Sequence, residues 1–221
     1  MKKEFDFIGQ FRAGCQALDL AEPDAEAAEK LFVYFTELKK WSRRVNLIAK
    51  GATDEDILEK HFLDSLTLLP FLSAENPHLL DIGTGAGFPG LVCKVVMPEL
   101  QVTLVEPRFK RVSFLRHIVR TLQLQDIRVL ECRAEDAEKL SVDDGFTHIT
   151  SRAVSDITLF MAMCSRFAKP DLKVVCMKGP KWKEELDLYL ASGEEQVFSF
   201  SAAREYVLPN SKSIRNVMVF E

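Results

Sequence analysis

A glycine-rich turn with an acid in front of it is the part of this sequence best suited to hold a ligand. The apolar run Leu79–Ile82 includes Asp81, a helical pattern follows over 91–97, and between them lie glycines at 83, 85, 87 and 90. This order predicts a buried parallel strand that turns sharply into a helix, the place where open α/β sheets bind nucleotide-like ligands. Asp81 could accept hydrogen bonds from the ligand or orient the turn. Because glycines permit unusual φ angles and leave room beside the backbone, we expect the cofactor at Asp81, Gly83, Gly85 and Gly87.

The spacing of these glycines distinguishes between cofactors. A dinucleotide fingerprint needs G-x-G-x-x-G, but Phe88 stands where its third glycine would be, and Gly90 is too far from Gly85 to replace it. No G-K-[ST] follows the turn, which excludes a P-loop. The pattern Asp-x-Gly-x-Gly-x-Gly is similar to that of doubly wound methyltransferases that use S-adenosylmethionine (SAM). The spacing therefore favours SAM over NAD.

Acidic residues follow the next two predicted strands. Glu106 ends the strand predicted over 101–106, where an acid can accept hydrogen bonds from two ribose hydroxyls. Ala134 and Glu135 follow the strand predicted over 127–132, in the loop that faces the adenine in this fold. A backbone N–H and an acid there could read the base. All three residues are candidate cofactor contacts.

Cations at two strand ends are candidates for holding the substrate. Lys110 and Arg111 open the helix predicted over 108–123, where two cations in the first turn oppose the helix dipole. That cost favours a functional role, such as binding RNA phosphate or a guanine edge. Arg152 follows the strand predicted over 146–151, a position that contacts substrate in many SAM enzymes. We therefore take Arg152, Lys110 and Arg111 as the candidate catalytic residues.

The elements that must position these residues alternate strand and helix from residue 78 onward, which predicts a parallel sheet. The remaining strands are expected at 78–82, 172–178, 195–207 and 215–220, and the remaining helices at 88–97, 134–140, 156–168 and 181–191. The polar stretch 209–213 joins the last two strands, so we expect them to pair antiparallel. The fold class is α/β: a doubly wound, Rossmann-like methyltransferase sheet of seven mostly parallel strands.

The first 72 residues form a helical extension packed on the methyltransferase domain, which we place at 73–221. A helix is expected to start near Asp24, and Thr53 with Asp56 makes a capping box for another. His61 and Asp64 lie three residues apart, on a different face from the apolar stripe of that second helix. They could hydrogen-bond each other, or both could project toward the ligand cleft.

Composition restricts the class of protein. The 221 residues are enough for one α/β domain with a small appendage. A net charge of −4 means that any nucleic-acid contact must come from a local basic patch. Five cysteines without a C-x-x-C pattern indicate reduced core residues and no metal site. Neither a secretory signal nor an apolar run of membrane length is visible, so we expect a cytoplasmic protein, for which a monomer is adequate.

Taken as a set, these motifs resemble those of the bacterial small-subunit (16S) ribosomal RNA guanine-N7 methyltransferase family, long called glucose-inhibited division protein B. The residues that carry the resemblance are Trp41, Asn46-Leu47, His61–Ser65, Asp81–Gly90, Lys110–Leu115, Arg133–Glu135, Ser151–Ala153 and Lys178-Gly179. One departure stands out. Family members often have Ser-Leu-Gly before the Lys-Arg pair, and this chain has Pro107-Arg108-Phe109.

The resemblance implies methyl transfer from SAM to N7 of one guanosine in the decoding-region loop, with 16S rRNA or the small ribosomal subunit as partner. The positions that match the family's SAM contacts are Gly83, Phe88, Ala134, Glu135 and Arg152, and those that match its RNA-holding cations are Lys110, Arg111, Arg133 and Arg152. Guanine N7 carries a lone pair and no proton, so the reaction needs no general base. We therefore expect His61 and Asp64 to shape the substrate wall.

Three alternatives stay open at this point. The acidic net charge also permits a SAM methyltransferase that acts on a small molecule or a protein. A SAM-binding subunit without catalytic activity is another alternative, since fold does not fix function. An NAD(P)-dependent oxidoreductase is disfavoured by Phe88 and by the lack of an evident hydride-transfer pair.

Overall fold

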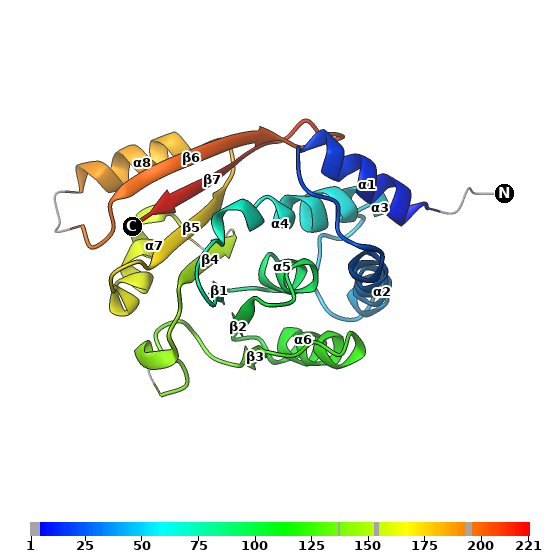
Figure 1. The fold of residues 1–221 in the computed structure, drawn as a ribbon, viewed down its shortest axis with the longest axis horizontal. Helices are drawn as coiled ribbons and strands as arrows, with labels where there is room; N and C mark the ends of the chain where they lie inside the picture. The colour runs from blue at the N-terminus through cyan, green and yellow to red at the C-terminus, as the bar shows by residue number, and fades with distance from the viewer. Residues whose placement is uncertain (1–4, 137, 153–154, 193–195) are drawn as a thin grey trace.

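The computed structural model describes residues 5–136, 138–152, 155–192 and 196–221. Within these ranges, seven strands form one sheet in the order β3-β2-β1-β4-β5-β7-β6 (Figure 1). They are β1 (His78–Ile82), β2 (Gln101–Val105), β3 (Ile127–Leu130), β4 (His148–Arg152), β5 (Lys173–Lys178), β6 (Phe200–Val207) and β7 (Ile214–Phe220). Strands β1 to β5 pair in parallel, and β7 pairs antiparallel with both β5 and β6. The predicted sheet and its C-terminal hairpin are confirmed.

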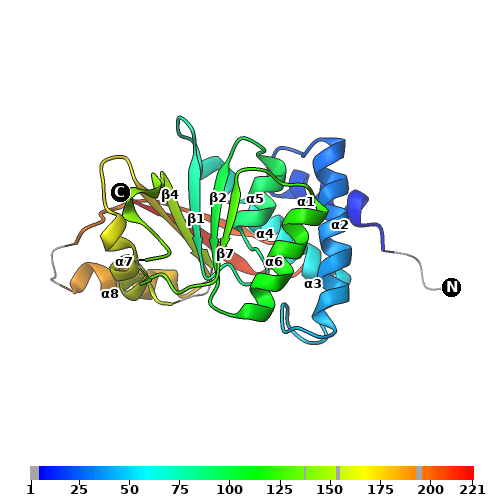
Figure 2. The same ribbon diagram turned by 90° about the horizontal axis from the view of Figure 1, so that it is seen from below.

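Helices cover both faces of this sheet (Figure 2). Along β1, Leu79 packs into the core of one face and Leu80 into the core of the other, as expected for a parallel strand buried on both sides. The second core includes α7 (Ile157–Cys164) and α8 (Trp182–Ala191), and the first includes α1 (Phe7–Ala17), α2 (Ala25–Ser42), α5 (Gly90–Val96) and α6 (Phe109–Thr121). Among the described residues, no helix has the length and apolar character needed to span a membrane.

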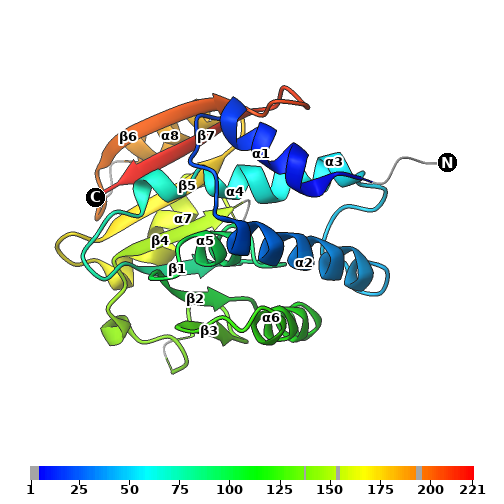
Figure 3. The ribbon, with the colours of Figure 1, turned by 45° about the vertical axis from the view of Figure 1, so that its right-hand side comes forward.

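The segment that leads into the sheet contains the predicted caps and one unexpected turn. Asp24 caps α2, and Thr53 with Asp56 forms a capping box at α3 (Asp54–Ile57). The chain then widens into a π-helix, η1 (Leu58–Leu63), before α4 (Asp64–Leu66) and the 3₁₀ turn η2 (Leu69–Phe71). Figure 3 shows α3 and α4 beside α1. π-Helical turns are frequent at functional sites.

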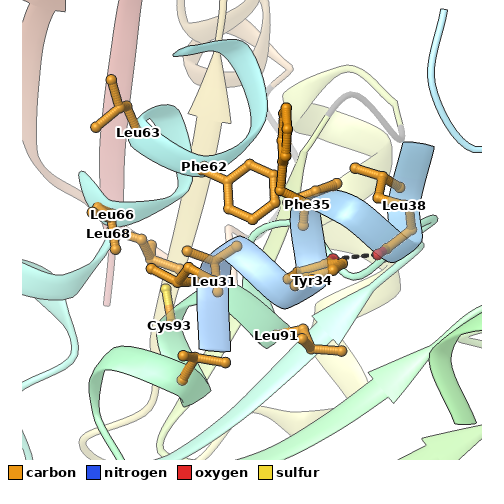
Figure 4. Packing of buried hydrophobic residues seen from close by; sticks show 14 of the residues in the cluster. Leu31, Tyr34, Phe35, Leu38, Phe62, Leu63, Leu66, Leu68, Leu91 and Cys93 are labelled. Atoms are coloured by element: carbon orange, nitrogen blue, oxygen red, sulfur yellow. Dashed lines mark hydrogen bonds between the residues drawn. The ribbon is translucent and has the colours of Figure 1, made fainter. Parts of the chain in front are cut away.

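The extension meets the glycine-rich turn through an aromatic core. In Figure 4, Tyr34 and Phe35 of α2 lie against Phe62 of η1, with Leu91 of α5 below them. The buried hydroxyl of Tyr34 donates a hydrogen bond to the carbonyl of Ala86 in the turn. Helix α2 therefore supports the turn directly, while the domain boundary at residue 72 stays a prediction.

Removing this hydroxyl should weaken both the fold and the ligand turn. In Tyr34→Phe the buried Ala86 carbonyl loses its donor, which should lower the free energy of unfolding by about 1–2 kcal/mol. SAM affinity should fall with it. Tyr189→Phe is the matched control, because its buried hydroxyl donates to Phe198 O on the other face of the sheet. Urea unfolding and calorimetric titration with SAM test both; if SAM affinity drops equally in the two variants, α2 does not support the turn specifically.

The helix predicted over 134–140 is wrong. The described residues of this segment form turns, followed by the 3₁₀ turn η3 (Val142–Asp144). The Arg166 guanidinium donates to the carbonyls of Ala134 (3.2 Å) and Leu140 (2.5 Å). In a helix over 134–140, the Ala134 carbonyl would instead accept from the N–H of residue 138. Helix-favouring residue types were outweighed by this tertiary contact. Ala153 of the Ser151–Ala153 motif lies outside the described residues.

Candidate functional site

The glycine-rich turn is held from below by Asp81. Gly83, Gly85 and Gly87 have φ angles of 68°, 62° and 101°, in the left-handed region that favours glycine. Asp81 Oδ2 accepts hydrogen bonds from the Thr84 hydroxyl (2.7 Å) and from the Gly90 N–H (2.8 Å). The carboxyl is fully buried beneath the turn. Of the two roles considered for Asp81, orientation of the turn is the one that these bonds support.

The same burial gives Asp81 an unusual dependence on pH. Burial raises the pKa of Asp81 to about 6, although the hydrogen bonds from Thr84 and Gly90 act in the lowering direction. Its second oxygen, Oδ1, has no hydrogen-bond partner among the described residues. Compared with the unfolded chain, in which the pKa of this carboxyl has its ordinary value of 3.8, the folded state therefore holds the proton more tightly. Its contribution to stability is complete below pH 4 and is lost as the pH rises through about 6.

We expect this loss to disappear in Asp81→Asn, which cannot ionise. Between pH 4 and pH 6.5, the wild-type protein should lose about 2 kcal/mol of unfolding free energy relative to the variant. Urea titrations of both proteins at several pH values measure this difference. A difference that stays constant with pH would show that Asp81 remains ionised in the folded protein.

A cleft of about 1260 Å³ opens above the carboxyl ends of the parallel strands. It exceeds the roughly 300–1,000 Å³ of ordinary small-molecule pockets, which leaves room for a cofactor and part of a second ligand. The predicted residues that line it are Gly83, Gly85, Phe88, Glu106, Arg111, Arg152, His61 and Asp64. The predicted residues outside its lining are Asp81, Gly87, Lys110, Arg133, Ala134 and Glu135. The cleft therefore lies where the strand ends predicted it, but several of the residues predicted to line it lie beneath or beside it.

Glu106 joins the turn to helix α6. Its Oε2 accepts from the Gly85 N–H (3.1 Å) and lies 3.5 Å from Arg111 Nη1, while Oε1 accepts from the Arg108 N–H (2.9 Å). Arg111 also donates through Nε to the Asn46 carbonyl (3.3 Å). A carboxylate has four lone-pair sites, so Glu106 keeps capacity for a ligand hydroxyl. Arg111 therefore links Asn46 of the N-terminal extension to Glu106 at the floor of the cleft.

Arg152 is the centre of the opposite wall. Its Nη1 donates to the Lys60 carbonyl (2.8 Å) and to Asp64 Oδ2 (3.2 Å), and its Nη2 lies 3.0 Å from His61 Nδ1. The guanidinium also lies over the ring of Phe88, 5.3 Å from the centroid. His61 and Asp64 therefore both face the cleft and meet through Arg152, which settles the two arrangements that their spacing left open.

The C-terminal hairpin contributes to this wall in a way that sequence analysis missed. Tyr206 donates to Asp64 Oδ1 (2.8 Å), and Arg215 Nε lies 3.6 Å from the same oxygen and lines the cleft. Glu59 is buried and accepts hydrogen bonds from the backbone N–H groups of residues 210 and 211. Glu59 lies among other charged residues in the sequence, and nothing in that local pattern revealed a partner 151 residues away.

The turn and Glu106 fit SAM. An added Cβ on Gly85 would meet nothing closer than 3.8 Å, so the floor of the cleft is open above the turn. The buried acid at the end of β2 borders the same space, at the place where α/β folds hold ribose. The residues that would hold SAM in this cleft are Gly83, Gly85, Phe88 and Glu106.

Solved structures with the same fold include proteins named as methyltransferases. A SAM-dependent methyltransferase from Aquifex aeolicus superposes with a TM-score of 0.55 at 21% identity, covering 84% of this chain and 97% of that one. A precorrin-6y C5,15-methyltransferase from Geobacter metallireducens gives a TM-score of 0.53 at 14% identity, covering 78% and 91%. At these identities the likeness shows the fold alone.

Sequence comparisons identify the family. The family model described as GidB, rRNA small subunit methyltransferase G, matches residues 27–217. The ribosomal RNA small subunit methyltransferase G of Desulfotalea psychrophila is 52% identical over 218 residues, covering 97% of this chain and 98% of that protein. The protein of the same name from Myxococcus xanthus is 39% identical over 215 residues, covering 97% and 96%. The chain therefore belongs to the rRNA small subunit methyltransferase G family, whose members named here are methyltransferases.

Proposed function

We propose that this protein transfers a methyl group from SAM to N7 of a specific guanosine in the decoding-region loop of 16S rRNA. The family match over residues 27–217 is the observation that carries the proposal. The relatives named as small-subunit rRNA methyltransferases align over almost their whole length with this chain.

The chemistry of the cleft supports transfer to a nitrogen that carries no proton. When bound, SAM supplies a methyl group on a positively charged sulfur. Guanine N7 presents an in-plane lone pair, so the enzyme's residues need only position the base. The two groups beside Arg152 that could act as a base are both engaged: His61 Nδ1 lies against Arg152, and Asp64 accepts from Arg152 and Tyr206.

We assign the remaining roles by position around the cleft. Ala134 and Glu135 would border the adenine beside the SAM contacts already named, with Gly87 and Asp81 shaping the turn. The cations that would hold RNA are Lys110, Arg111, Arg133 and Arg152. Lys50, Lys60 and Arg108 also line the cleft, and such a local group of cations offers a contact for phosphate although the chain carries a net charge of −4.

One chain supplies the cleft lining from Leu47 to Arg215, so we propose that the protein acts as a monomer. The extension 1–72 would serve as part of the cleft wall on the 73–221 domain. An rRNA substrate also favours a cytoplasmic location.

The test is transfer of tritium from labelled SAM to small-subunit rRNA that lacks this modification, offered naked and as assembled subunits. We expect label in 7-methylguanosine after nucleoside analysis, and none with rRNA that already carries the methyl group. The preferred form of the RNA identifies the substrate. Absence of label in both forms, with SAM binding intact, would overturn the proposal in favour of a small-molecule substrate or a regulatory role.

A further inference from the structure

The two ring nitrogens of His61 have different surroundings. Nδ1 lies 3.0 Å from Arg152 Nη2. Nε2 has no hydrogen-bond partner among the described residues. It is also absent from the fully buried polar atoms that lack a partner, so Nε2 is not fully buried. Because the side chain lines the cleft, Nε2 is the ring nitrogen available to a ligand.

The contact with Arg152 determines which nitrogen carries the proton. A guanidinium is always protonated and can only donate, so Nδ1 of His61 must accept. Burial, and after it the charges of Arg152 and Lys60, lower the pKa of His61 to about 3. The ring is therefore neutral near pH 7, and its single N–H is on Nε2. The cleft wall therefore presents a hydrogen-bond donor that is uncharged near pH 7.

The direction of this donor is also determined by packing. The His61 ring stacks on Phe88, with centroids 4.9 Å apart and planes inclined by 25°. Arg152, which fixes the other edge of the ring, is itself held by Asp64 and by the Lys60 carbonyl. Phe88 directly follows the glycine turn, so the donor is held beside the place where the cofactor would bind. Three of the five N–H donors of Arg152 are engaged by the protein's own groups, which holds its guanidinium in place against the ring.

We propose that the Nε2–H of His61 donates to O6 of the target guanine and thereby selects guanine at the methyl-accepting position. This inference rests on the proposed function. N7 and O6 lie on the same edge of guanine, and when N7 faces the methyl group only O6 remains for a donor. Adenine presents an amino donor at that position, which would oppose the Nε2–H. An uncharged donor also draws less electron density from N7 than a cation would.

A cycle that combines protein variants with substrate analogues tests this contact. His61→Asn leaves an amide oxygen that can still accept from Arg152, but it removes the donor at Nε2. The substrates are small-subunit rRNAs that carry guanosine, inosine or 2-aminopurine at the target position; inosine keeps O6, and 2-aminopurine lacks it. We expect His61→Asn to slow single-turnover transfer by about five- to tenfold on guanosine and inosine, and by less than about twofold on 2-aminopurine.

His117→Asn is the matched control, because this histidine pairs with Glu37 away from the cleft lining. It should change the rates on all three RNAs equally and only slightly. An equal loss on all three RNAs in His61→Asn, or a fall in its calorimetric SAM affinity of tenfold or more, would overturn the contact with O6. If the wild-type protein does not methylate the guanosine rRNA at all, the proposed function fails. If it makes 7-methylguanosine, but His61→Asn slows transfer by the same factor with and without O6 in the substrate, only this inference fails.

Discussion

Arg152→Met should lower methyl transfer by at least about 100-fold and the free energy of unfolding by about 2–3 kcal/mol. Arg152 bridges Asp64, His61 and the Lys60 carbonyl, and Asp64 is buried, with only 4% of its side chain exposed. Breaking a buried ion pair costs about 3–5 kcal/mol, and Tyr206 and the partial exposure of Arg152 reduce that cost here. A loss of 100-fold in rate corresponds to about 2.7 kcal/mol of transition-state stabilisation.

Arg128→Met gives the comparison for this result. Arg128 pairs with Asp144 at 2.9 Å, but about half of its side chain is exposed, so its removal should cost less than about 1 kcal/mol and leave transfer unchanged. Urea unfolding and single-turnover tritium transfer are measured on both variants. Equal unfolding midpoints, together with full transfer by Arg152→Met, would show that the Arg152 contacts do not hold the cleft wall.

Gly87→Ala should destabilise the protein by about 2–4 kcal/mol and weaken SAM binding by more than tenfold. Gly87 has a φ of 101°, and an added Cβ would lie 2.6 Å from the Tyr34 hydroxyl and 3.0 Å from Leu91 Cβ. Strain at that φ and overpacking of the core each contribute about 1–3 kcal/mol. Because the Tyr34 hydroxyl also holds the Ala86 carbonyl, its displacement should disturb the turn that would hold SAM.

Gly145→Ala separates the two causes. Gly145 has a φ of 76°, and an added Cβ would meet nothing within 4 Å, so this variant contains the backbone strain without the overpacking. We expect it to cost about 1 kcal/mol and to leave SAM affinity unchanged. Should both variants lose the same unfolding free energy, the close approach of α2 to the turn would not matter for stability.

The sheet could be predicted from sequence because its signals are local. Apolar runs over 78–82 and 101–105 end in acids or glycines, and the alternation with helices continues to the hairpin. The helix predicted over 134–140 failed because Arg166, distant in sequence, binds the carbonyls of that segment. Local propensity contains no information about such a contact. For the same reason, the π-helical turn at 58–63 could not be separated from an α-helix with the same buried stripe.

The candidate site was predicted in part. Residues at strand ends, such as Glu106 and Arg152, line the cleft because parallel strands bring their carboxyl ends to one edge. The roles of His61 and Asp64 depend on Arg152, about 90 residues further along the chain, and their spacing alone could not show it. The family resemblance, now confirmed over residues 27–217, identified the reaction class more surely than any single residue did.

The contacts of Glu59 in η1 and Asp64 in α4 with the C-terminal hairpin set an order in time during synthesis. Tyr206 follows its partner Asp64 by 142 residues, and the backbone groups that bind Glu59 come later still. Because a chain emerges from its N-terminus, the contacts of Glu59 with the hairpin and of Asp64 with Tyr206 wait until residues 206–211 have been made. The wall that holds Arg152 and His61 is therefore completed only when the last strands join the sheet. A chain truncated before β6 would contain the glycine turn but no finished substrate wall.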